Sequence, residues 1–405
     1  MEKEALIPQR PARRYLSNEF KVESWKQLQP VLDELLDRKL DSSSSLEDWI
    51  HDLSEVEAVL SEETAWRYIR MNIDTKNKEY EDAFNFMITE IDPNAAPYSD
   101  KFNRKLLESE FLEELDQHKY RIFLRSLKMQ IKLYREESIP VFTKLQQLQQ
   151  KYGAITGSMS IEHQGNTLTL QMANSLLKET DRELRQSVYE KVNEARLSKK
   201  DELNALFTEL IELRDIVAKQ ADYKNYRDYK LDALGRFDYS AEDCFTFHKA
   251  IKAECVPLVN RIDEERRNQL GVDSLKPFDG DVDPTGKQGL KPFKGEKELI
   301  AKSIEAFRRI RPYYGECLET MNAMGHLDLE SRLGKAPGGF NYPLYEIGVP
   351  FIFMNSVGSV RDLITMVHEG GHAVHSFLSK DLEITAFKNL PSEVAELASM
   401  SMELL

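Results

Sequence analysis

Apolar residues recur at spacings of three and four along most of the chain, among abundant Glu, Lys, Leu, Gln and Arg. This period predicts amphipathic helices that each bury one face. One such run covers residues 46–60, and Ser45 with Asp48 fits a capping box at its start. A second helical run extends over about 112–152 and ends near a glycine.

The helical pattern breaks near residue 92. Residues 92–97 read Asp-Pro-Asn-Ala-Ala-Pro, and proline disfavours a helix interior. We therefore predict an N-terminal helical subdomain over residues 1–115 and a second, larger domain over residues 116–405. No repeat of fixed period is present, which argues against a solenoid.

Two segments show the period of a β-strand instead. Residues 158–163 and 167–170 alternate around Gln-Gly-Asn, which predicts a β-hairpin. Residues 340–355 are rich in aromatic and β-branched residues and contain two prolines, which predicts one or two strands at a sheet edge. The fold class is therefore mainly α with a small β component. Two further helices are predicted by capping boxes, Thr180 with Glu183 and Ser240 with Asp243.

Composition narrows the class of protein. Hydrophobic residues make up 41% and charged residues 31% of the 405 residues, which predicts a sizeable core and a well-solvated surface. The formal net charge of −14 disfavours nucleic acid and anionic lipid as partners. Neither a secretory signal nor an apolar run of ~18 residues is present. Three cysteines without CxxC spacing indicate a reducing compartment, so we expect a cytoplasmic protein.

An acidic connection spans residues 271–295. Asp279, Asp281 and Asp283 alternate there, as in a calcium-binding loop. The EF-hand pattern requires a glutamate at its twelfth position, where this chain has Leu290. We therefore interpret the segment as a solvated acidic loop.

The segment 362–378 carries the most specific pattern, His368-Glu369-Gly-Gly-His372. Apolar residues around it recur at helical spacing, so the two imidazoles lie one turn apart on one face. That spacing suits one Zn²⁺ ion, and Glu369 can face the metal-bound water. Zinc lowers the pKa of that water towards ~7, and Glu369 would take its proton during attack on a carbonyl.

Gly370 and Gly371 together cost the helix about 1.5–2 kcal/mol relative to alanine. We interpret this as a helix surface kept bare so that a strand or a substrate can approach; tight helix packing is the alternative. A strand at a sheet edge beside this helix could hydrogen-bond an extended peptide. His375 follows three residues after His372, and we leave it outside the metal set.

A third metal ligand is needed. The long metzincin motif is excluded because His375 and Leu378 stand where it requires Gly and His. A downstream glutamate remains, and spacing alone does not choose among Glu383, Glu393, Glu396 and Glu403. The last three belong to a helix predicted to open at Pro391 or Ser392.

Three stretches, GKAPGGF, PFIFMNSVGSVRDLITMVHEGGHAVHSFL and AELASMSMEL, resemble the oligoendopeptidase F branch of the thimet-oligopeptidase family of zinc metallopeptidases. The resemblance implies an elongated multi-helix fold with a substrate channel and a small β-sheet beside the HExxH helix. It also implies one zinc ion on His368, His372 and Glu396, with Glu369 as general base. Glu396 matches because an acid, Glu403, follows it by seven residues. Short peptides would be the substrates.

The resemblance has one departure, at the C-terminus. Family members continue well past the third ligand, whereas this chain stops nine residues after Glu396. The absent segment is expected to close the channel and to supply histidine and tyrosine side chains that stabilise the oxyanion. Residues 116–405 are thus expected to form a catalytic zinc-peptidase domain that is incomplete at its C-terminus.

Two hypotheses follow for the function. The first is a zinc endopeptidase that hydrolyses short peptides. The alternative is a non-catalytic remnant, or half of a split peptidase that binds a complementing chain. In the second case the missing C-terminal segment would be a partner.

Overall fold

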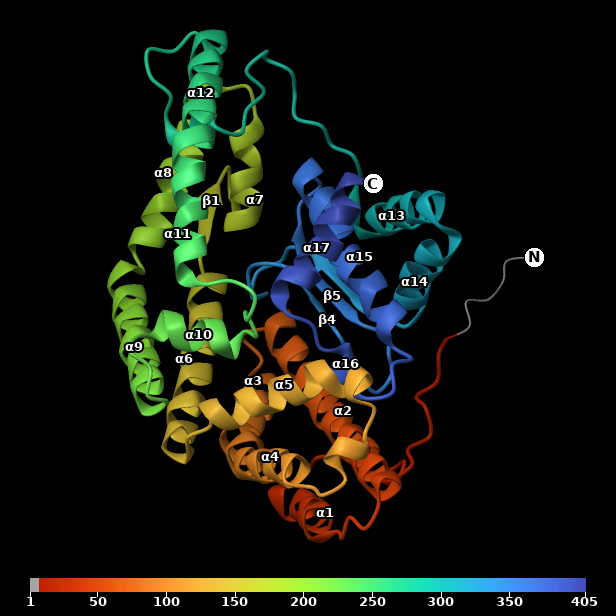
Figure 1. The fold of residues 1–405 in the computed structure, drawn as a ribbon. Coiled ribbons are helices and arrows are strands. Elements are labelled where there is room, and N and C mark those ends of the chain that lie inside the picture. Colours follow the sequence, from red (N-terminus) through yellow and green to blue (C-terminus); the bar gives the residue numbers. More distant parts are fainter. Residues whose placement is uncertain (1–6) are drawn as a thin grey trace, which may run out of the picture.

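The computed structural model describes residues 7–405 and is built mainly of helices, with two small sheets (Figure 1). The mainly α prediction is therefore confirmed. The N-terminal part packs around one apolar core that includes the fully buried Trp49. Its helices are α1 (Trp25–Asp37), α2 (Ser43–Ile73), α3 (Lys78–Phe86), α4 (Asp92–Leu107) and α5 (Gln117–Leu133). Short π- or 3₁₀-helical turns are η1 (Met87–Ile91), η2 (Leu112–Glu114) and η3 (Glu136–Ser138).

Two local predictions for this part are wrong. The chain does not break at residues 92–97, because α4 begins there directly after the π-helical turn η1. Pro93, which has no N–H, directly follows this turn, in which the N–H of Asp92 donates to the carbonyl of Met87 and the α-helical hydrogen-bond pattern is shifted by one residue. Likewise α2 begins three residues earlier than predicted, because Ser42 and Ser45 form its capping box. The division at residue 115 remains a prediction.

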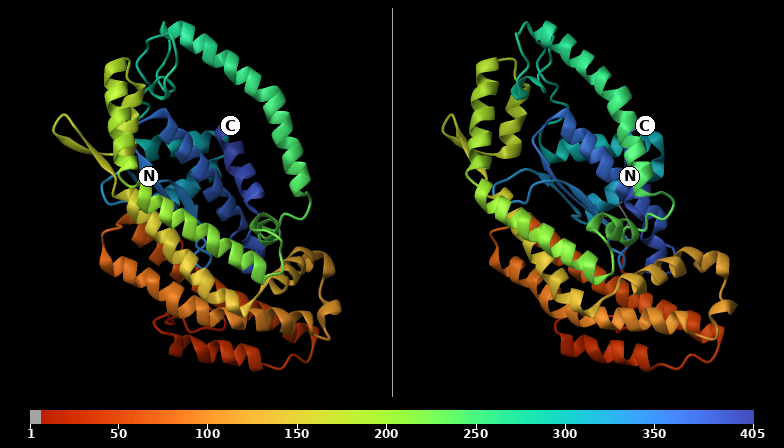
Figure 2. Two further views of the ribbon diagram at one scale, coloured as in Figure 1. Left: turned by 90° about the vertical axis from the view of Figure 1, so that its left-hand side faces the viewer. Right: turned by 60° about the vertical axis from the view of Figure 1, so that its left-hand side comes forward.

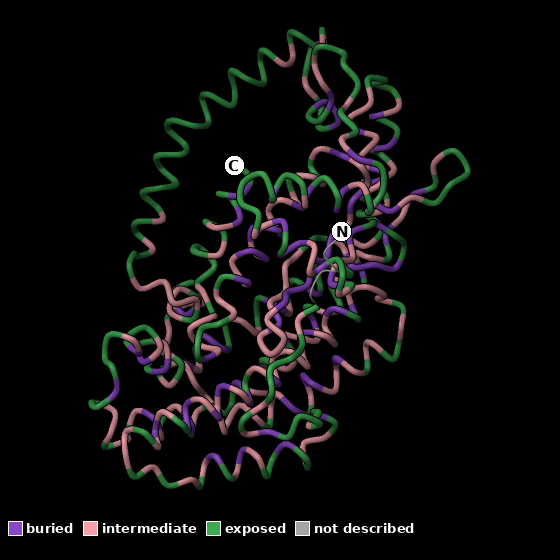
Figure 3. Tube along the Cα trace, turned by 90° about the vertical axis from the view of Figure 1, so that its right-hand side faces the viewer, coloured by how far each residue is buried: buried purple, intermediate pink, exposed green. Residues whose placement is uncertain are grey.

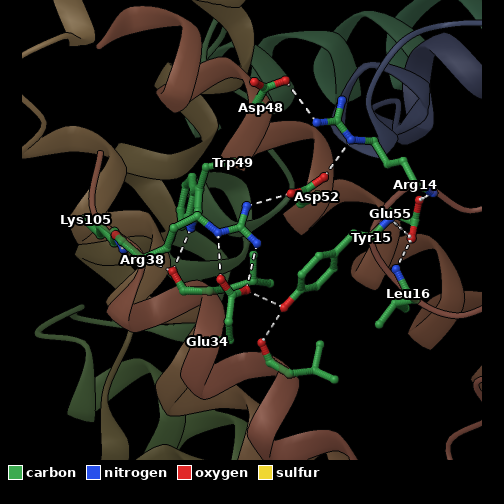
Figure 4. A network of polar contacts seen from close by, with 12 residues as sticks. Arg14, Tyr15, Leu16, Glu34, Arg38, Asp48, Trp49, Asp52, Glu55 and Lys105 are labelled. Atoms are coloured by element: carbon green, nitrogen blue, oxygen red, sulfur yellow. Dashed lines mark hydrogen bonds and ion pairs between the residues drawn. The ribbon is translucent and has the colours of Figure 1, made fainter. Parts of the chain in front are cut away.

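A network of ion pairs fixes the start of the chain to α1 and α2 (Figure 4). Asp52 of α2 binds Arg14 at 2.7 Å and Arg38 at 2.6 Å, so one carboxylate joins two segments. The carboxylate of Glu55 accepts the backbone N–H of Leu16 at 2.7 Å. These contacts hold the extended N-terminal segment against the first long helices.

The middle of the chain contains a hairpin and a series of long helices. The predicted hairpin is confirmed as β1 (Ser160–His163) paired with β2 (Asn166–Thr169), turning through positive φ at Gln164 and Gly165. The capping box of Ser240 and Asp243 is also confirmed. The helix predicted from Thr180 is capped by Asp181 instead. The helices are α6 (Ile139–Gly157), α7 (Leu170–Ser175), η4 (Leu176–Lys178), α8 (Arg182–Leu197), α9 (Lys200–Gln220) and α10 (Tyr226–Ala233).

A long helical arm follows, made of α11 (Ala241–Ala250), the π-helical turn η5 (Ile251–Cys255) and α12 (Val256–Leu270). None of its residues is buried by the rest of the described chain. The arm bows away from the C-terminal half in Figure 2 and is exposed almost throughout in Figure 3. The apolar side chains of the arm are therefore not covered by the other described residues.

The acidic loop after this arm differs from the sequence interpretation at one residue. Asp279, in the turn η6 (Pro277–Asp279), is fully buried and pairs with Arg182 at 2.9 Å and Arg185 at 3.0 Å. Burial disfavours the carboxylate. Hydrogen bonds from Arg182, the backbone N–H of Lys276 and Arg185 outweigh that cost and lower the pKa of Asp279 to about 2. The description of Asp279 as solvated is thus wrong.

The C-terminal part places a small sheet beside a long helix, as the resemblance implied. The sheet has the order β3-β5-β4, with β3 (Leu327–Glu330) parallel and β4 (Phe340–Tyr342) antiparallel to the central β5 (Phe351–Ser356). The prediction of edge strands is correct for β4, whereas β5 is the central strand. Pro350 precedes β5 and leaves its ladder intact. The helices are α13 (Gly295–Ile310), α14 (Pro312–Ala323), α15 (Val360–Ser379), α16 (Thr385–Lys388) and α17 (Ser392–Leu404).

None of the helices within residues 7–405 combines the length and the apolar character that crossing a bilayer demands.

Candidate metal centre

Helix α15 presents the two histidines of the HExxH pattern. Ser359 and Asp362 form a capping box that fixes its start. One face, including Met366 and Ala373, is buried in the core beneath the sheet. The rings of His368 and His372 then lie on one face, with centroids 4.9 Å apart and planes at 88°. The prediction that His368 and His372 lie one helical turn apart on the same face is therefore confirmed.

Helix α17 brings a carboxylate to these two imidazoles. Glu396 Oε2 lies 3.3 Å from His368 Nε2, and Glu396 Oε1 lies 3.8 Å from His372 Nε2. One ligand atom from each of the three residues falls within 4.8 Å of the others, so the group could hold a metal ion. The contact between α15 and α17 is therefore what assembles the site.

The other glutamates that spacing left open lie elsewhere. Glu383 pairs with Lys119 on α5. Glu393 pairs with Arg236 at 2.8 Å, although it is on the same helix as Glu396. Neither carboxylate belongs to the group that could hold a metal.

Glu403, the fourth candidate, lies behind the site. Its Oε1 is 2.6 Å from His368 Nδ1, on the far side of the ring from Glu396. A carboxylate at Nδ1 holds the proton there and leaves Nε2 free to bind a metal, as in carboxylate–histidine–metal arrangements. The seven-residue spacing from Glu396 places both acids on one face of α17.

Glu369 faces the site from α15 and is only 7% exposed. Burial raises the pKa of Glu369 to about 7, while His368 and the backbone N–H of Asn341 act in the opposite direction. A divalent cation on the three neighbouring groups would also favour the carboxylate form. Burial lowers the pKa of His372, which favours the neutral imidazole that binds metals.

The two glycines of α15 serve helix packing, so the interpretation that they admit a strand or substrate is wrong. A Cβ at Gly370 would come within 2.6 Å of the ring of Phe307 on α13. A Cβ at Gly371 would come within 2.8 Å of Cα of Ser399 on α17. Gly371 therefore permits the close approach of the helix that carries Glu396. Tight packing, the alternative considered from the sequence, accounts for both.

Ser399 and Asn341 are site residues that sequence reasoning did not identify. Ser399 is fully buried against Gly371, and its hydroxyl donates to the backbone carbonyl of Glu396 at 3.0 Å. Asn341 lies on edge strand β4, paired with Ile352 of β5. No local signal marks either residue, because each acquires its role from an element distant in sequence.

Comparisons with known proteins identify the family of the chain. Residues 175–405 match peptidase family M3, and residues 17–134 match the peptidase M3 N-terminal domain. The chain is 29% identical over 148 residues to the plasmid oligoendopeptidase F of Lactococcus lactis subsp. cremoris, covering 36% of this chain and 24% of that protein. It is 24% identical over 232 residues to oligopeptidase PepF of Bacillus subtilis (strain 168), covering 57% and 33%. The matched segments thus span a quarter to a third of these relatives.

Solved structures share the fold over almost the whole chain. A protein assigned as an oligoendopeptidase F from Bacillus anthracis str. Ames superposes with a TM-score of 0.90 at 23% identity, covering 95% of this chain and 71% of that one. PZ peptidase A with inhibitor 2 also gives 0.90 at 23% identity, covering 96% and 69%. The family match extends over more than half of the chain, and it agrees with the resemblance inferred from the motifs. The chain therefore belongs to peptidase family M3 and is of the oligoendopeptidase F type.

Proposed function

We propose that this chain carries the zinc site of an endopeptidase that hydrolyses short peptides. His368, His372 and Glu396 are the ligands in this proposal, and Glu369 is the general base. The observation that carries it is the meeting of two imidazoles and one carboxylate from two helices, with a buried acid on the adjacent position of α15.

The donor set fits zinc. Two imidazoles and a carboxylate are a known catalytic zinc set that leaves a coordination position open. Tetrahedral bonds of ~2.0–2.1 Å hold ligand atoms roughly 3.3–3.4 Å apart, and the two separations from Glu396 are 3.3 and 3.8 Å. Glu403 supplies the outer carboxylate that orients His368.

Zinc at this site would polarise the scissile carbonyl and acidify water. The protein itself supplies a proton acceptor and a fixed geometry. Glu369, adjacent to the first histidine, accepts a proton from the attacking water and can return it to the leaving amine. Its burial keeps bulk water away from the carboxylate and raises its basicity towards neutral pH.

Edge strand β4 supports a peptide as substrate. It pairs only with β5 among the described strands, and α15 packs against it. An extended peptide could add to this edge through main-chain hydrogen bonds, which do not depend on its side chains. The backbone N–H of Asn341 at this edge also acts to lower the pKa of Glu369, which indicates that the strand lies close to the base.

A direct test combines metal analysis with cleavage of a quenched fluorescent peptide. We expect about one zinc ion per chain and activity that falls by about 10²–10⁴-fold in Glu369→Gln. Zinc content should persist in this variant, because Glu369 is not a ligand in the proposal. Absence of bound zinc in the wild type, or undiminished cleavage by Glu369→Gln, would eliminate the function.

A second candidate is a half-site peptidase that needs a complementing polypeptide. The arm carries an apolar stripe at helical spacing with no cover from the described residues: Phe247 (64% exposed), Ile251 (38%), Leu258 (48%) and Ile262 (53%). The outer face of α17 is also apolar and uncovered, at Val394, Leu397 and Met400. Exposed apolar patches of this kind mark interaction surfaces.

We propose that the occupant of these faces is a polypeptide equivalent to the part of the structural neighbours that has no counterpart here. The chain covers 69–71% of those neighbours, so such a part exists. Adding the corresponding segment of a neighbour in trans should raise cleavage, and Phe247→Ser should weaken this gain without lowering the stability of the isolated chain. Full activity of the 405 residues alone would refute the need for a second chain.

A further inference from the structure

A cavity of about 220 Å³ opens beside His372 and follows the C-terminal half of α15. Helix α15 forms one wall through His375 and Ser379, together with Lys380 directly after the helix, and the segment between β4 and β5 forms another wall. The end of α16 and the start of α17 close the remaining side at Lys388 and Ala395. The cavity thus begins at the candidate metal centre and extends away from His368.

The charges that line this cavity are all of one sign. Lys380 and Lys388 line it, and no aspartate or glutamate does. This is unusual for a chain with a formal net charge of −14, in which acidic residues outnumber basic ones. The cavity is therefore a basic site in an acidic protein.

Neither lysine has a carboxylate partner within ion-pair distance among the described residues. Lys388 is half-buried, and burial lowers its pKa although the charge of Asp381 acts in the opposite direction. A half-buried ammonium without a partner costs free energy that a bound anion would recover.

A further polar group of the cavity lining is also without a partner. Asn341 Nδ2 is buried and makes no hydrogen bond among the described residues. It lines the cavity, as His372 does. Pro343, Leu344 and Leu390 add apolar side chains to the lining. This combination suits a ligand with an aliphatic stem and an anionic end.

We propose that this cavity is a substrate subsite that binds a carboxylate of the peptide, with Lys388 as the residue that selects it and Lys380 in support. The carboxylate is an acidic side chain or the free C-terminus of the peptide, since both present the same group. The inference rests on the proposed peptidase function, and it names the class of peptide that the site prefers.

The test measures binding without turnover. The full chain carrying Glu369→Gln is loaded with zinc, and fluorescence anisotropy gives the dissociation constants of labelled pentapeptides. One series of peptides compares Glu with Gln at each position, and a second series compares a free C-terminus with its amide. In one of the two series, we expect the peptide with the carboxylate to bind about tenfold more tightly than the peptide with the amide.

Lys388→Met removes the charge and keeps most of the aliphatic stem. Added to the Glu369→Gln chain, it should reduce the preference for the acid to less than about twofold. Lys297→Met is the matched control, because Lys297 is an exposed residue of α13 outside the cavity, and it should leave the preference unchanged. Thermal unfolding of each variant shows that the fold is kept.

The outcomes separate this inference from the proposed function. Equal affinities for the carboxylate and the amide in both series of peptides would overturn the proposed subsite. Equal effects of Lys388→Met and Lys297→Met would overturn it as well. A retained preference that depends on Lys388 supports it even when the wild-type chain cleaves nothing. Absent cleavage would then count against the proposed function alone.

Discussion

Gly371→Ala is the change that most directly tests how the metal centre is assembled. A Cβ at this position would lie 2.8 Å from Cα of Ser399 and 3.0 Å from Cβ of Met402, both on α17. The nearer atom belongs to the backbone and cannot rotate away. The alanine must therefore displace α17 as a unit, and α17 carries Glu396.

The size of the displacement follows from these contacts. Carbon atoms pack best at about 3.5–4.0 Å, so α17 must retreat by roughly 0.7–1.2 Å. Overpacking of a core costs ~1–3 kcal/mol, and replacing glycine by alanine inside a helix returns ~0.8–1 kcal/mol. We therefore expect the free energy of unfolding to fall by only about 0–2 kcal/mol.

The metal should respond more strongly than the fold. Ligand distances in a metal site tolerate about ±0.2 Å, so a retreat near 1 Å would take Glu396 out of bonding range. We expect zinc affinity to fall by roughly 10–100-fold or more. Competition with a chromogenic chelator measures this affinity, and urea unfolding of the same preparations measures stability.

Gly370→Ala is the matched control. It adds the same methyl group to the same helix, but the nearest atom is the ring of Phe307 at 2.6 Å on α13, which carries no ligand. This variant should lose stability and keep zinc affinity close to that of the wild type. If folded Gly371→Ala binds zinc as tightly as the wild type, or if Gly370→Ala loses as much affinity, the reasoning is refuted.

Two further predictions concern single acids. Glu403→Gln should lower zinc affinity by about 10–100-fold, because the carboxylate 2.6 Å from His368 Nδ1 no longer orients the ring; chelator competition that shows no change would contradict this. Asp279→Asn should lower the free energy of unfolding at pH 7 by about 2–4 kcal/mol, because Arg185 is left buried without its partner. Folding lowers the pKa of Asp279 from 3.8 to about 2, so its stabilisation is complete above about pH 4 and is lost as the pH falls towards 2. Urea unfolding across that range should therefore be flatter in the variant than in the wild type.

Features that depend on short-range spacing could be predicted from the amino-acid pattern alone. Helical periodicity placed His368 and His372 on one face, and alternation around Gln164 and Gly165 gave the hairpin. Both patterns are properties of a few consecutive residues, so no distant contact is needed to read them. The same holds for the capping box at Ser240, where side chain and backbone are three residues apart.

Contacts between groups distant in the sequence could not be predicted in this way and follow from how the helices pack. Four glutamates were equivalent by spacing, and the approach of α17 to α15 brings Glu396 to the histidines while Glu393 turns to Arg236. The reason for Gly371 lies in Ser399, and the burial of Asp279 depends on Arg182 and Arg185 nearly a hundred residues earlier. Such contacts depend on how whole helices pack, and packing is set by shape and volume across the core rather than by the local pattern of the chain.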